Sequence, residues 1–446
     1  MVHLGLGAFH RSHQAWYTQQ ARDAGEWGIA AFTGRRPDAA DALAAQDGLY
    51  TLVVRSDQGD DFELINSVVE AVDGADVDRL TELVASPLTA IVTLTITEAA
   101  YGLRDDETRP ERASTPLGRL VRALDARRVT GAGPLAVVSC DNLPDNGSVV
   151  GGALLRLAEE SDPELAAWIR REVSFVSTSV DRITPRAAPA DAAAVAAACG
   201  YRDDAPVVTE PFHDWVLSGT FPAGRPRWED AGALFVEDIE PYENRKLWLL
   251  NGAHSLLAYA GQLRGHETVA EALNDAVCRA AVDAFWDEAS SHLAATATAG
   301  ADLHIPEYRA ALMERFGNSR IAHRLAQIAV DGTTKLRMRA LPVLRAERAA
   351  GRSGAATAVM LAAWVDFVAA AAEVADPLAA ELAHTNALAG RPRLAALLTL
   401  VDPSLGEDPQ VLDLVDSLLG WFRPGRQPLS NADLHSNTGP RPKGTS

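Results

Sequence analysis

Three polar residues whose side chains can do proton chemistry are spaced along one apolar helical run. Lys246, Asn251 and His254 stand in it with Glu243 one turn earlier, among Leu247, Leu249, Leu250, Leu256 and Leu257. At about 100° per residue the four polar side chains fall on one helix face. Apolar neighbours would desolvate the lysine and lower its pKa towards neutrality, which suits a general base. The spacing predicts a site, although a solvated polar face of an amphipathic helix would look the same.

Composition limits the classes of partner. The chain has 446 residues, 47% of them hydrophobic, and a formal net charge of −19. That charge, without any Lys/Arg block, argues against nucleic-acid and anionic-membrane partners and favours a small-molecule substrate. No apolar run is long enough to span a membrane and no signal peptide is evident. Three widely spaced cysteines indicate neither a disulfide framework nor a structural zinc site, so we expect a cytoplasmic protein.

Short β-rich runs alternate with helical patterns in the first half of the chain. The runs are 2–4, 28–33, 50–54, 90–97, 135–140 and 174–180, with helical patterns at 117–127 and 149–160. Strands that alternate with helices predict an α/β fold, a Rossmann-like doubly wound sheet. Residues 49–54 and 61–68 flank a turn-like segment and predict an antiparallel hairpin inserted in this unit.

The composition changes near residue 238, where Ala- and Leu-rich helical patterns replace the β-rich runs. We therefore predict a dinucleotide-binding domain over 1–238 and an all-helical substrate-binding domain over 239–424. Residues 425–446 are rich in Pro, Gly, Asn and Ser and are predicted to be a disordered tail. Very little chain precedes the first strand, so the natural start could lie upstream of Met1. No helix shows a clear heptad seam, which fits a monomer or a small homo-oligomer.

A glycine pair follows the first strand directly. Gly5 and Gly7 match the front half of a dinucleotide-binding turn, in which backbone amides at a helix start approach a pyrophosphate. His10 stands where the third glycine of that pattern is expected, so the pattern by itself is weak. The acid that commonly follows the second strand of an NAD site is missing. Arg35 and Arg36 stand there instead, as 2′-phosphate contacts or as solvated surface, which leaves NAD and NADP both open.

Five ordered blocks of the sequence resemble those of a known family, the polyol-specific long-chain dehydrogenase/reductases, also called the mannitol dehydrogenase family. The resemblance runs from Val2 to about Pro342. The blocks are Gly5 to Arg11, Thr93 to Glu98, Ser139 to Pro144, Ser179 to Pro185 and Lys246 to His254. It implies metal-independent hydride transfer between a nicotinamide, NAD by preference, and a linear polyol or the matching ketose.

The resemblance also implies roles for particular residues. Lys246 would be the general acid/base, Asn142 and Asn251 would polarise the reacting oxygen, and His254 would orient the substrate. Glu243 resembles a glutamate that gates proton exchange with solvent, although an i,i+3 surface pair would place it equally well. Asp181, Arg324 and Lys335 would contact the substrate, with a helix-capping role as the alternative for Asp181. The cofactor would lie against Gly5, Gly7, Ala8, Phe9, His10, Arg11, Arg35, Thr97 and Glu98.

Two departures from the family pattern weaken parts of this assignment. Ala99 and Ala100 replace the Lys-Gly pair usually found before Tyr101, on the cofactor wall. Thr33 to Arg35 differs from the acid-bearing loop of some members, at the adenosine end.

The sequence leaves alternatives for the substrate and for the class of protein. A mannitol-type hexitol is the favoured substrate, as mannitol to fructose or mannitol 1-phosphate to fructose 6-phosphate, with reduction of the keto-uronate fructuronate as the alternative. A non-catalytic dinucleotide sensor would keep the glycine turn but has no use for a lysine among carboxamides. A zinc-dependent dehydrogenase is suggested only by Gly265-His266-Glu267, which lacks a set of three ligands.

Overall fold

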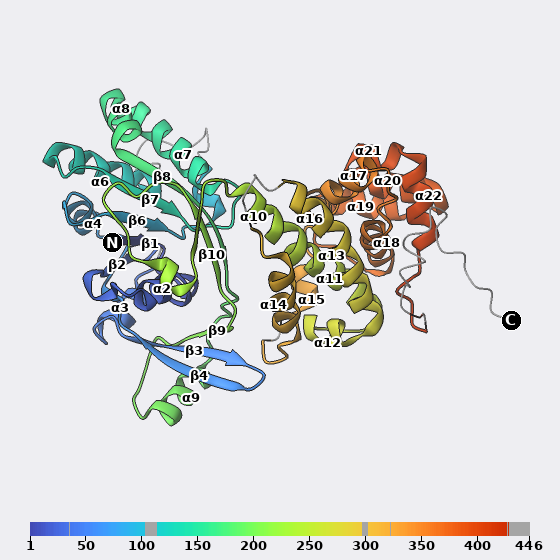
Figure 1. Ribbon diagram of the computed structural model, residues 1–446, viewed down its shortest axis with the longest axis horizontal. Helices are drawn as coiled ribbons and strands as arrows, with labels where there is room; N and C mark the ends of the chain where they lie inside the picture. The colour runs from blue at the N-terminus through green and yellow to red at the C-terminus, as the bar shows by residue number, and fades with distance from the viewer. Residues whose placement is uncertain (35, 103–113, 297–301, 322, 426, 428–446) are drawn as a thin grey trace. The chain divides into compact units, whose positions relative to one another are not determined.

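A computed structural model describes residues 1–34, 36–102, 114–296, 302–321, 323–425 and 427. The chain forms two compact units, Met1–Glu240 and Pro241–Ser446 (Figure 1). Arg35 and most of the predicted tail, 425–446, lie outside the described residues.

The first unit is built around a sheet with the strand order β11-β10-β8-β7-β6-β1-β2-β5. From β5 to β8 all neighbours are parallel, whereas β10 runs antiparallel to β8. The order reverses at β1, between β2 and β6, which makes the carboxyl ends of β1 and β6 the switch point of a doubly wound sheet. The strands are β1 Val2–Leu4, β2 Ile29–Phe32, β5 Val68–Val72, β6 Ile91–Leu94, β7 Leu135–Ser139, β8 Val173–Asp181, β10 Asp214–Ser218 and β11 Leu234–Val236.

A second, three-stranded sheet contains the predicted hairpin. β3 (Tyr50–Ser56) and β4 (Gly59–Ile65) are antiparallel, and β9 (Val207–Thr209) adds to β3 in parallel. The hairpin prediction is confirmed, but 50–54 does not belong to the main sheet and Val68 opens β5 instead of ending the hairpin. β5, β10 and β11 were not predicted, because strands of three to five residues carry little periodic signal.

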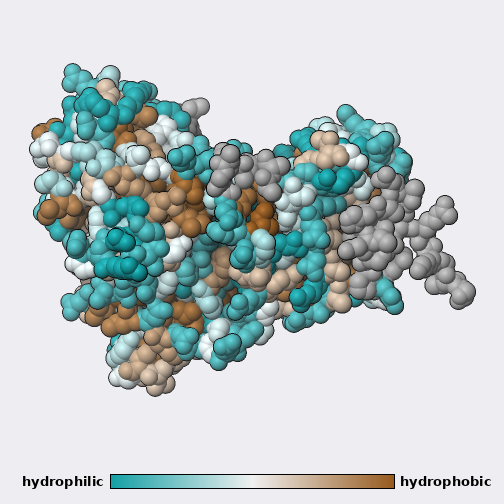
Figure 2. Space-filling view, viewed as in Figure 1, coloured by the Kyte–Doolittle hydropathy of each residue, from teal (hydrophilic) through white to brown (hydrophobic). Residues whose placement is uncertain are grey.

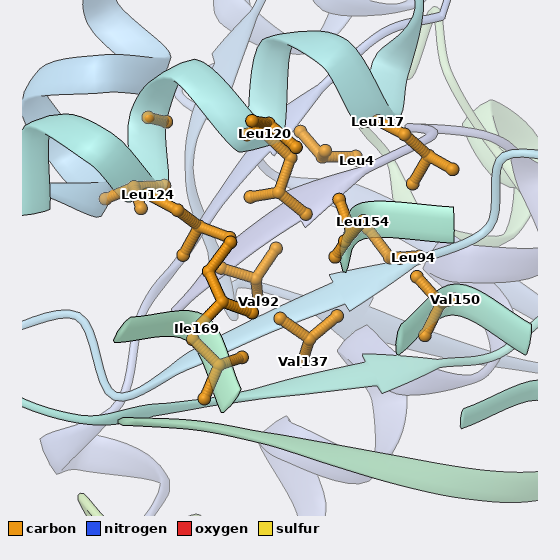
Figure 3. Close-up of a cluster of buried hydrophobic side chains, with 14 of the residues drawn as sticks. Leu4, Val92, Leu94, Leu117, Leu120, Leu124, Val137, Val150, Leu154 and Ile169 are labelled. Atoms are coloured by element: carbon orange, nitrogen blue, oxygen red, sulfur yellow. The ribbon is translucent and has the colours of Figure 1, made fainter. Parts of the chain in front are cut away.

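Helices cover both faces of the main sheet. The core shown in Figure 3 joins one strand face to the helices above it, with Val92, Leu94 and Val137 packed against Leu120 and Leu154. Side chains alternate along a strand, so Ile91, Ala136 and Val138 pack on the opposite face. The helices of this unit are α1 Ala8–Ser12, α2 Gln14–Gln20, α3 Asp38–Ala44, α4 Val77–Val84, α6 Pro116–Thr130, α7 Asn146–Ser161, α8 Pro163–Glu172 and α9 Pro189–Cys199.

The second unit is helical throughout its described residues, with a single isolated bridge between Thr268 and Arg324. α11 packs against α12, α13, α15 and α18, and α18 is buried along most of its length. The helices are α10 Glu240–Arg245, η4 Lys246–Gly252, α11 Ala253–Leu263, α12 Val269–Asn274, α13 Ala276–Thr296, α14 Ile305–Gly317, α15 Leu325–Ile328, α16 Gly332–Arg339, α17 Leu341–Ala349, α18 Ala355–Ala370, α19 Ala379–Asn386, α20 Gly390–Val401, α21 Pro403–Glu407 and α22 Pro409–Leu418. The predicted fold class, a Rossmann-like sheet followed by helices, is confirmed.

Hydrophilic residues make up most of the surface that Figure 2 shows. Hydrophobic residues show there in separate groups. Among the described helices, none combines the length and the apolar character needed to cross a membrane.

Arg127 holds one end of the first unit together. Its buried guanidinium donates to five backbone carbonyls: those of Val84, Ser86, Ala132, Gly133 and Pro134, at 2.7–3.2 Å. These carbonyls end α4, follow α6 and lead into β7. A planar group with five donors is the side chain that can satisfy all of them at once.

We expect Arg127→Met to lower the free energy of unfolding by about 3 kcal/mol or more, because five carbonyls lose a charged donor while remaining buried. The matched control is Arg122→Met on the same helix. Arg122 is exposed and paired with the equally exposed Asp78 at 3.0 Å, so its loss should change stability by less than about 0.5 kcal/mol. Urea unfolding of both variants measures the difference, and equal losses would contradict the assignment.

Candidate functional site

The glycine turn after β1 is shaped by its neighbour β6. Gly5 has φ +108°, and a Cβ at this position would stand 2.0 Å from the carbonyl oxygen of Thr95. Gly7 differs: its φ is −131°, and the nearest atom to an added Cβ would be at 3.6 Å. The fold therefore requires glycine at Gly5, whereas Gly7 leaves open space at the start of α1, which has no side-chain cap. This arrangement fits the close approach of a dinucleotide pyrophosphate to backbone amides.

A buried histidine fixes the turn through two threonines. His3 Nδ1 lies 2.8 Å from Thr93 Oγ1, and His3 Nε2 lies 3.0 Å from Thr95 Oγ1. Thr95 donates its hydroxyl hydrogen to the carbonyl of Gly5 at 2.8 Å, so it accepts from His3 Nε2–H. The imidazole is then neutral with its proton on Nε2. Burial lowers the pKa of His3 to about 3, which keeps it so.

Ala8, Phe9, His10 and Arg11, which were also predicted to contact the cofactor, lie in α1. His10 is fully buried and stacks on His3 with ring centroids 3.4 Å apart, and Phe9 stacks on His13 at 5.0 Å. Arg11 donates to the carbonyl of Ala205 at 2.6 Å and thereby ties α1 to the segment before β9. We find these three side chains held in packing contacts. The backbone of the turn and Ala8 are the parts presented at the helix start.

Polar residues also gather at the carboxyl ends of β6, β7 and β8. Thr97 and Glu98 follow β6 and are exposed, and Asn142 follows β7 and is exposed. Asp181 ends β8, is 9% exposed and is paired in register with Asp214 of β10. Arg182, next to it, donates to the carbonyls of Ser12 and Glu210 and is structural. The sheet thus brings Asn142 and Asp181 to the edge at which doubly wound folds bind ligands.

Lys246 and Asn251 lie in a π-helical turn, which the sequence did not predict. The segment Lys246–Gly252 is π-helical between two α-helical segments. In an α-helix residues five apart are separated by about 140° around the axis, whereas π-helical bonding joins residues five apart across one turn. The wide turn therefore places Asn251 above Lys246 more closely than α-helical geometry would. Such π segments often occur at functional sites.

Side chains from three helices or loops hold this turn. Trp286 of α13 donates from Nε1 to the carbonyl of Leu249 at 2.7 Å. Arg339 of α16 donates to the carbonyl of Asn251 at 3.1 Å and to Ser255 Oγ at 2.9 Å. Before the turn, buried Arg245 donates to the carbonyl of Leu303 at 2.9 Å. Sequence reasoning missed all three, since each contact joins segments far apart in the chain. Within the run itself, only Gly252 hinted at an irregular helix, because glycine is uncommon inside helices.

His254, one turn further on, is 8% exposed and surrounded by basic groups. Its ring lies 4.7 Å from that of Phe316 and 4.9 Å edge-on from that of His323, and its Nε2 has no hydrogen-bond partner among the residues that the structure describes. Burial lowers its pKa well below the ordinary value, and the charges of His323, Arg315, Arg339 and Lys335 act in the same direction. A neutral His254 with an unused ring nitrogen can bond to a substrate hydroxyl.

The other two predicted substrate contacts differ in their surroundings. Lys335 is half-buried on α16, one turn before Arg339, and donates to the carbonyl of Ile328 at 3.0 Å. Arg324 is exposed and pairs with Glu267 at 3.3 Å. The structure thus brings Lys335 near His254, whereas Arg324 is held at the surface by Glu267. Both roles remain predictions.

Gly252, between Asn251 and His254, is required by packing. A Cβ there would stand 2.6 Å from the ring of Phe285 on α13. We expect Gly252→Ala to displace the π turn and to lower kcat roughly 10- to 100-fold, because small displacements of reacting groups are costly. Steady-state rates test this. The matched control, Gly317→Ala, meets nothing within 4 Å and should keep full activity. Unchanged kcat in Gly252→Ala would contradict the reading.

His266, which suggested a zinc site, contacts a carboxylate instead. Its Nε2 lies 3.0 Å from Asp275, which also accepts from Arg264 at 2.5 Å. Within the described residues, no group of three or more His, Cys, Asp or Glu side chains could hold a metal ion. A cavity of about 480 Å³ in the second unit is lined mainly by Ala and Val residues at or just after the ends of α15 and α18, and none of the predicted site residues forms its wall.

The strand order, the glycine turn at the switch point and a following helical unit define a dinucleotide-binding dehydrogenase architecture. Family models agree with each part. The model described as the mannitol dehydrogenase Rossmann domain matches residues 1–230, and the mannitol dehydrogenase C-terminal domain matches residues 238–417. The chain therefore belongs to the mannitol dehydrogenase family, as its sequence blocks indicated.

Similar proteins align with most of the chain. It is 37% identical to a D-mannonate oxidoreductase of Escherichia coli, over 95% of this chain and 92% of that protein. It is 38% identical to a D-arabinitol 4-dehydrogenase of Ralstonia nicotianae, over 82% and 83%. Among solved structures, a Pseudomonas fluorescens mannitol 2-dehydrogenase in ternary complex with NAD and D-mannitol matches with a TM-score of 0.75 and 33% identity, over 94% and 91%.

Proposed function

We propose that this chain catalyses reversible hydride exchange between NAD and one secondary hydroxyl of a linear polyol, with a mannitol-type hexitol as substrate. The matching reactions are mannitol to fructose, or mannitol 1-phosphate to fructose 6-phosphate. Support comes from membership of the family and from the similar mannitol 2-dehydrogenase, whose structure holds NAD and D-mannitol. The second strand ends without an acid, so NADP is a cofactor to be tested beside NAD.

The chemistry assigns one task to each residue. The neutral amine of Lys246 takes the hydroxyl proton as the hydride leaves the same carbon for the nicotinamide, which is the electron acceptor when bound. The carboxamides of Asn142 and Asn251 donate to the oxygen, whose negative charge grows as the proton leaves. His254 and Asp181 bind neighbouring hydroxyls. In the reductive direction, protonated Lys246 returns the proton to the new alkoxide.

The structural observation that carries the proton-transfer step of this proposal is the π-helical turn. It brings Lys246 and Asn251 to one side of the helix and is held by Trp286 and Arg339. A π turn gives up regular α-helical bonding inside an otherwise helical unit. Its alignment of a base with an oxygen-polarising amide suits proton transfer from an alcohol.

A second candidate substrate is a sugar acid, with fructuronate reduction as the reaction. The observation that favours it is the set of basic side chains around His254, namely Arg315, Lys335 and Arg339. A carboxylate on the sugar would be attracted by these cations, whereas a neutral hexitol gains nothing from their charge. The relative named for D-mannonate, itself a sugar acid, adds to this candidate.

Initial rates separate the candidates. Fructose, fructose 6-phosphate and fructuronate are each reduced with NADH and with NADPH, and mannitol is oxidised with NAD. We expect turnover with fructose or its phosphate. A kcat/KM at least tenfold higher for fructuronate would select the sugar-acid reading. Inactivity with all of them would overturn the proposed substrate class.

A further inference from the structure

Thr97 has a backbone conformation that a β-branched residue rarely adopts. It follows β6 with φ +74° and ψ 152°. This region is almost exclusive to glycine and is strained for residues with a side chain. Thr97 is also exposed and stands two residues after Thr95, whose carbonyl abuts Gly5 at the switch point. Strain of this kind persists only where surrounding groups enforce it.

Asp141 supplies the enforcing contacts. Its carboxylate accepts from the amide of Ile96 at 3.0 Å and from that of Thr97 at 2.8 Å, and it accepts the hydroxyl of Tyr101 at 2.5 Å. Asp141 is 8% exposed, and its own carbonyl accepts from Asn146 at 2.8 Å. Hydrogen bonds to a carboxylate are stronger than those to a neutral acceptor, so these three contacts can together hold the strained conformation of Thr97.

The contacts of Asp141 lie at the switch point of the sheet, where a dinucleotide would bind. A doubly wound sheet binds a dinucleotide across its switch point, and β6 opens the second of the two mononucleotide-binding halves. Thr97 and Glu98, which are exposed, therefore belong to the half that would receive the nicotinamide nucleotide. Asp141 also precedes Asn142 directly, so one carboxylate fixes the β6 loop and the start of the β7 loop together.

We propose that Asp141 is a positioning residue, which holds Thr97 in its strained conformation so that the loop after β6 presents a fixed wall to the nicotinamide nucleotide. The proposal rests on the proposed use of a nicotinamide cofactor. Asp141 does not touch the reacting atoms. It acts through Thr97 and through the anchored start of the loop that carries Asn142.

The test combines Asp141→Asn with Thr97→Gly. An amide keeps one acceptor oxygen and repels one backbone N–H, so Asp141→Asn should raise the KM and the Kd for NADH at least tenfold and lower Tm by about 5 °C. Glycine adopts φ +74° without strain, so Thr97→Gly tests whether the strain at this position accounts for the loss of Tm. In the double variant Tm should return close to the parent value while the KM for NADH stays at least tenfold raised.

Each outcome decides the proposal. If the KM returns together with Tm in the double variant, or if Asp141→Asn leaves the KM unchanged, Asp141 is merely structural. Should Asp141→Asn not fold, Tyr101→Phe removes only the hydroxyl donor and should raise the KM about threefold, and no change would overturn the proposal. The matched control is Asp145→Asn in the same loop, which should leave the KM for NADH unchanged. Asn tolerates the left-handed conformation found at this position (φ +46°). A parent enzyme that binds no dinucleotide would overturn the proposed function as well, whereas normal binding by both parent and Asp141→Asn overturns this inference alone.

Discussion

Lys246→Ala is expected to lower kcat about a thousandfold or more in both directions while the Kd for NADH stays within twofold of the parent value. Removal of a general base costs 10²–10⁴-fold in typical enzymes, and the helix that carries Lys246 is not the part of the chain that forms the dinucleotide turn. Stopped-flow rates and fluorescence titration measure the two quantities. Near-normal turnover would refute the role of Lys246.

Two further measurements separate loss of the base from general damage. A small primary amine such as ethylamine, added to Lys246→Ala, should restore part of the rate, because it replaces the missing Nζ. Lys335→Ala, a change of the same kind in the same unit, should instead raise the KM for the sugar with kcat within a few-fold. In the parent enzyme oxidation should quicken with rising pH and reduction should slow, since the first needs the neutral amine and the second its protonated form.

Acidification is expected to destabilise the first unit steeply below pH 6.5. Three histidines there, His3, His10 and His13, are fully buried. Burial lowers the pKa of His3 and of His13 to about 3 and holds that of His10 well below its ordinary value. The unfolded chain takes up these protons near pH 6.5, while the folded chain does not. The stabilisation is therefore complete above about pH 6.5 and is lost as pH falls towards 3.

Three such groups give a slope of up to about 4 kcal/mol per pH unit, as each contributes roughly 1.4. Urea unfolding at pH 7.5, 6.5, 5.5 and 5.0 measures it. His10→Phe keeps an aromatic ring stacked on His3 and should remove about one third of the slope that these three histidines contribute, to which His213 adds because burial lowers its pKa to about 4. His384→Gln, at an exposed position, should not alter it. A free energy of unfolding that stays flat between pH 6.5 and 5.5 would exclude this account.

Much of the fold was readable because its signals are local. The runs at 2–4, 135–140 and 174–180 correspond to β1, β7 and β8, in which β1 and β7 are buried at every residue and β8 is buried from Val176 onward. The helical segment after Gly7 is divided at His13, which adopts φ −119° and ψ −87° between α1 and α2. β5, β10 and β11 escaped prediction because pairing partners, not their own sequences, define them.

For the candidate site, spacing located Lys246, Asn251 and His254 but assumed α-helical geometry. The π-helical turn changes where Asn251 stands relative to Lys246, and its causes lie in Trp286, Arg339 and the ring of Phe285 beside Gly252. None of these can be found from a pattern within the run itself. The predicted catalytic and binding roles are untested and stay predictions.

The sequence by itself determined the family, the fold class and the residue types available for proton and hydride chemistry, because periodicity, glycines after a strand and ordered motif blocks are properties of neighbouring residues. Tertiary structure alone decided the backbone shapes on which that chemistry depends. Asp141, in the loop after β7, accepts from the amide of Thr97 in its strained conformation, and side chains of α13 and α16 donate to carbonyls of the wide turn at Lys246. Such long-range hydrogen bonds stabilise local conformations that no local propensity favours.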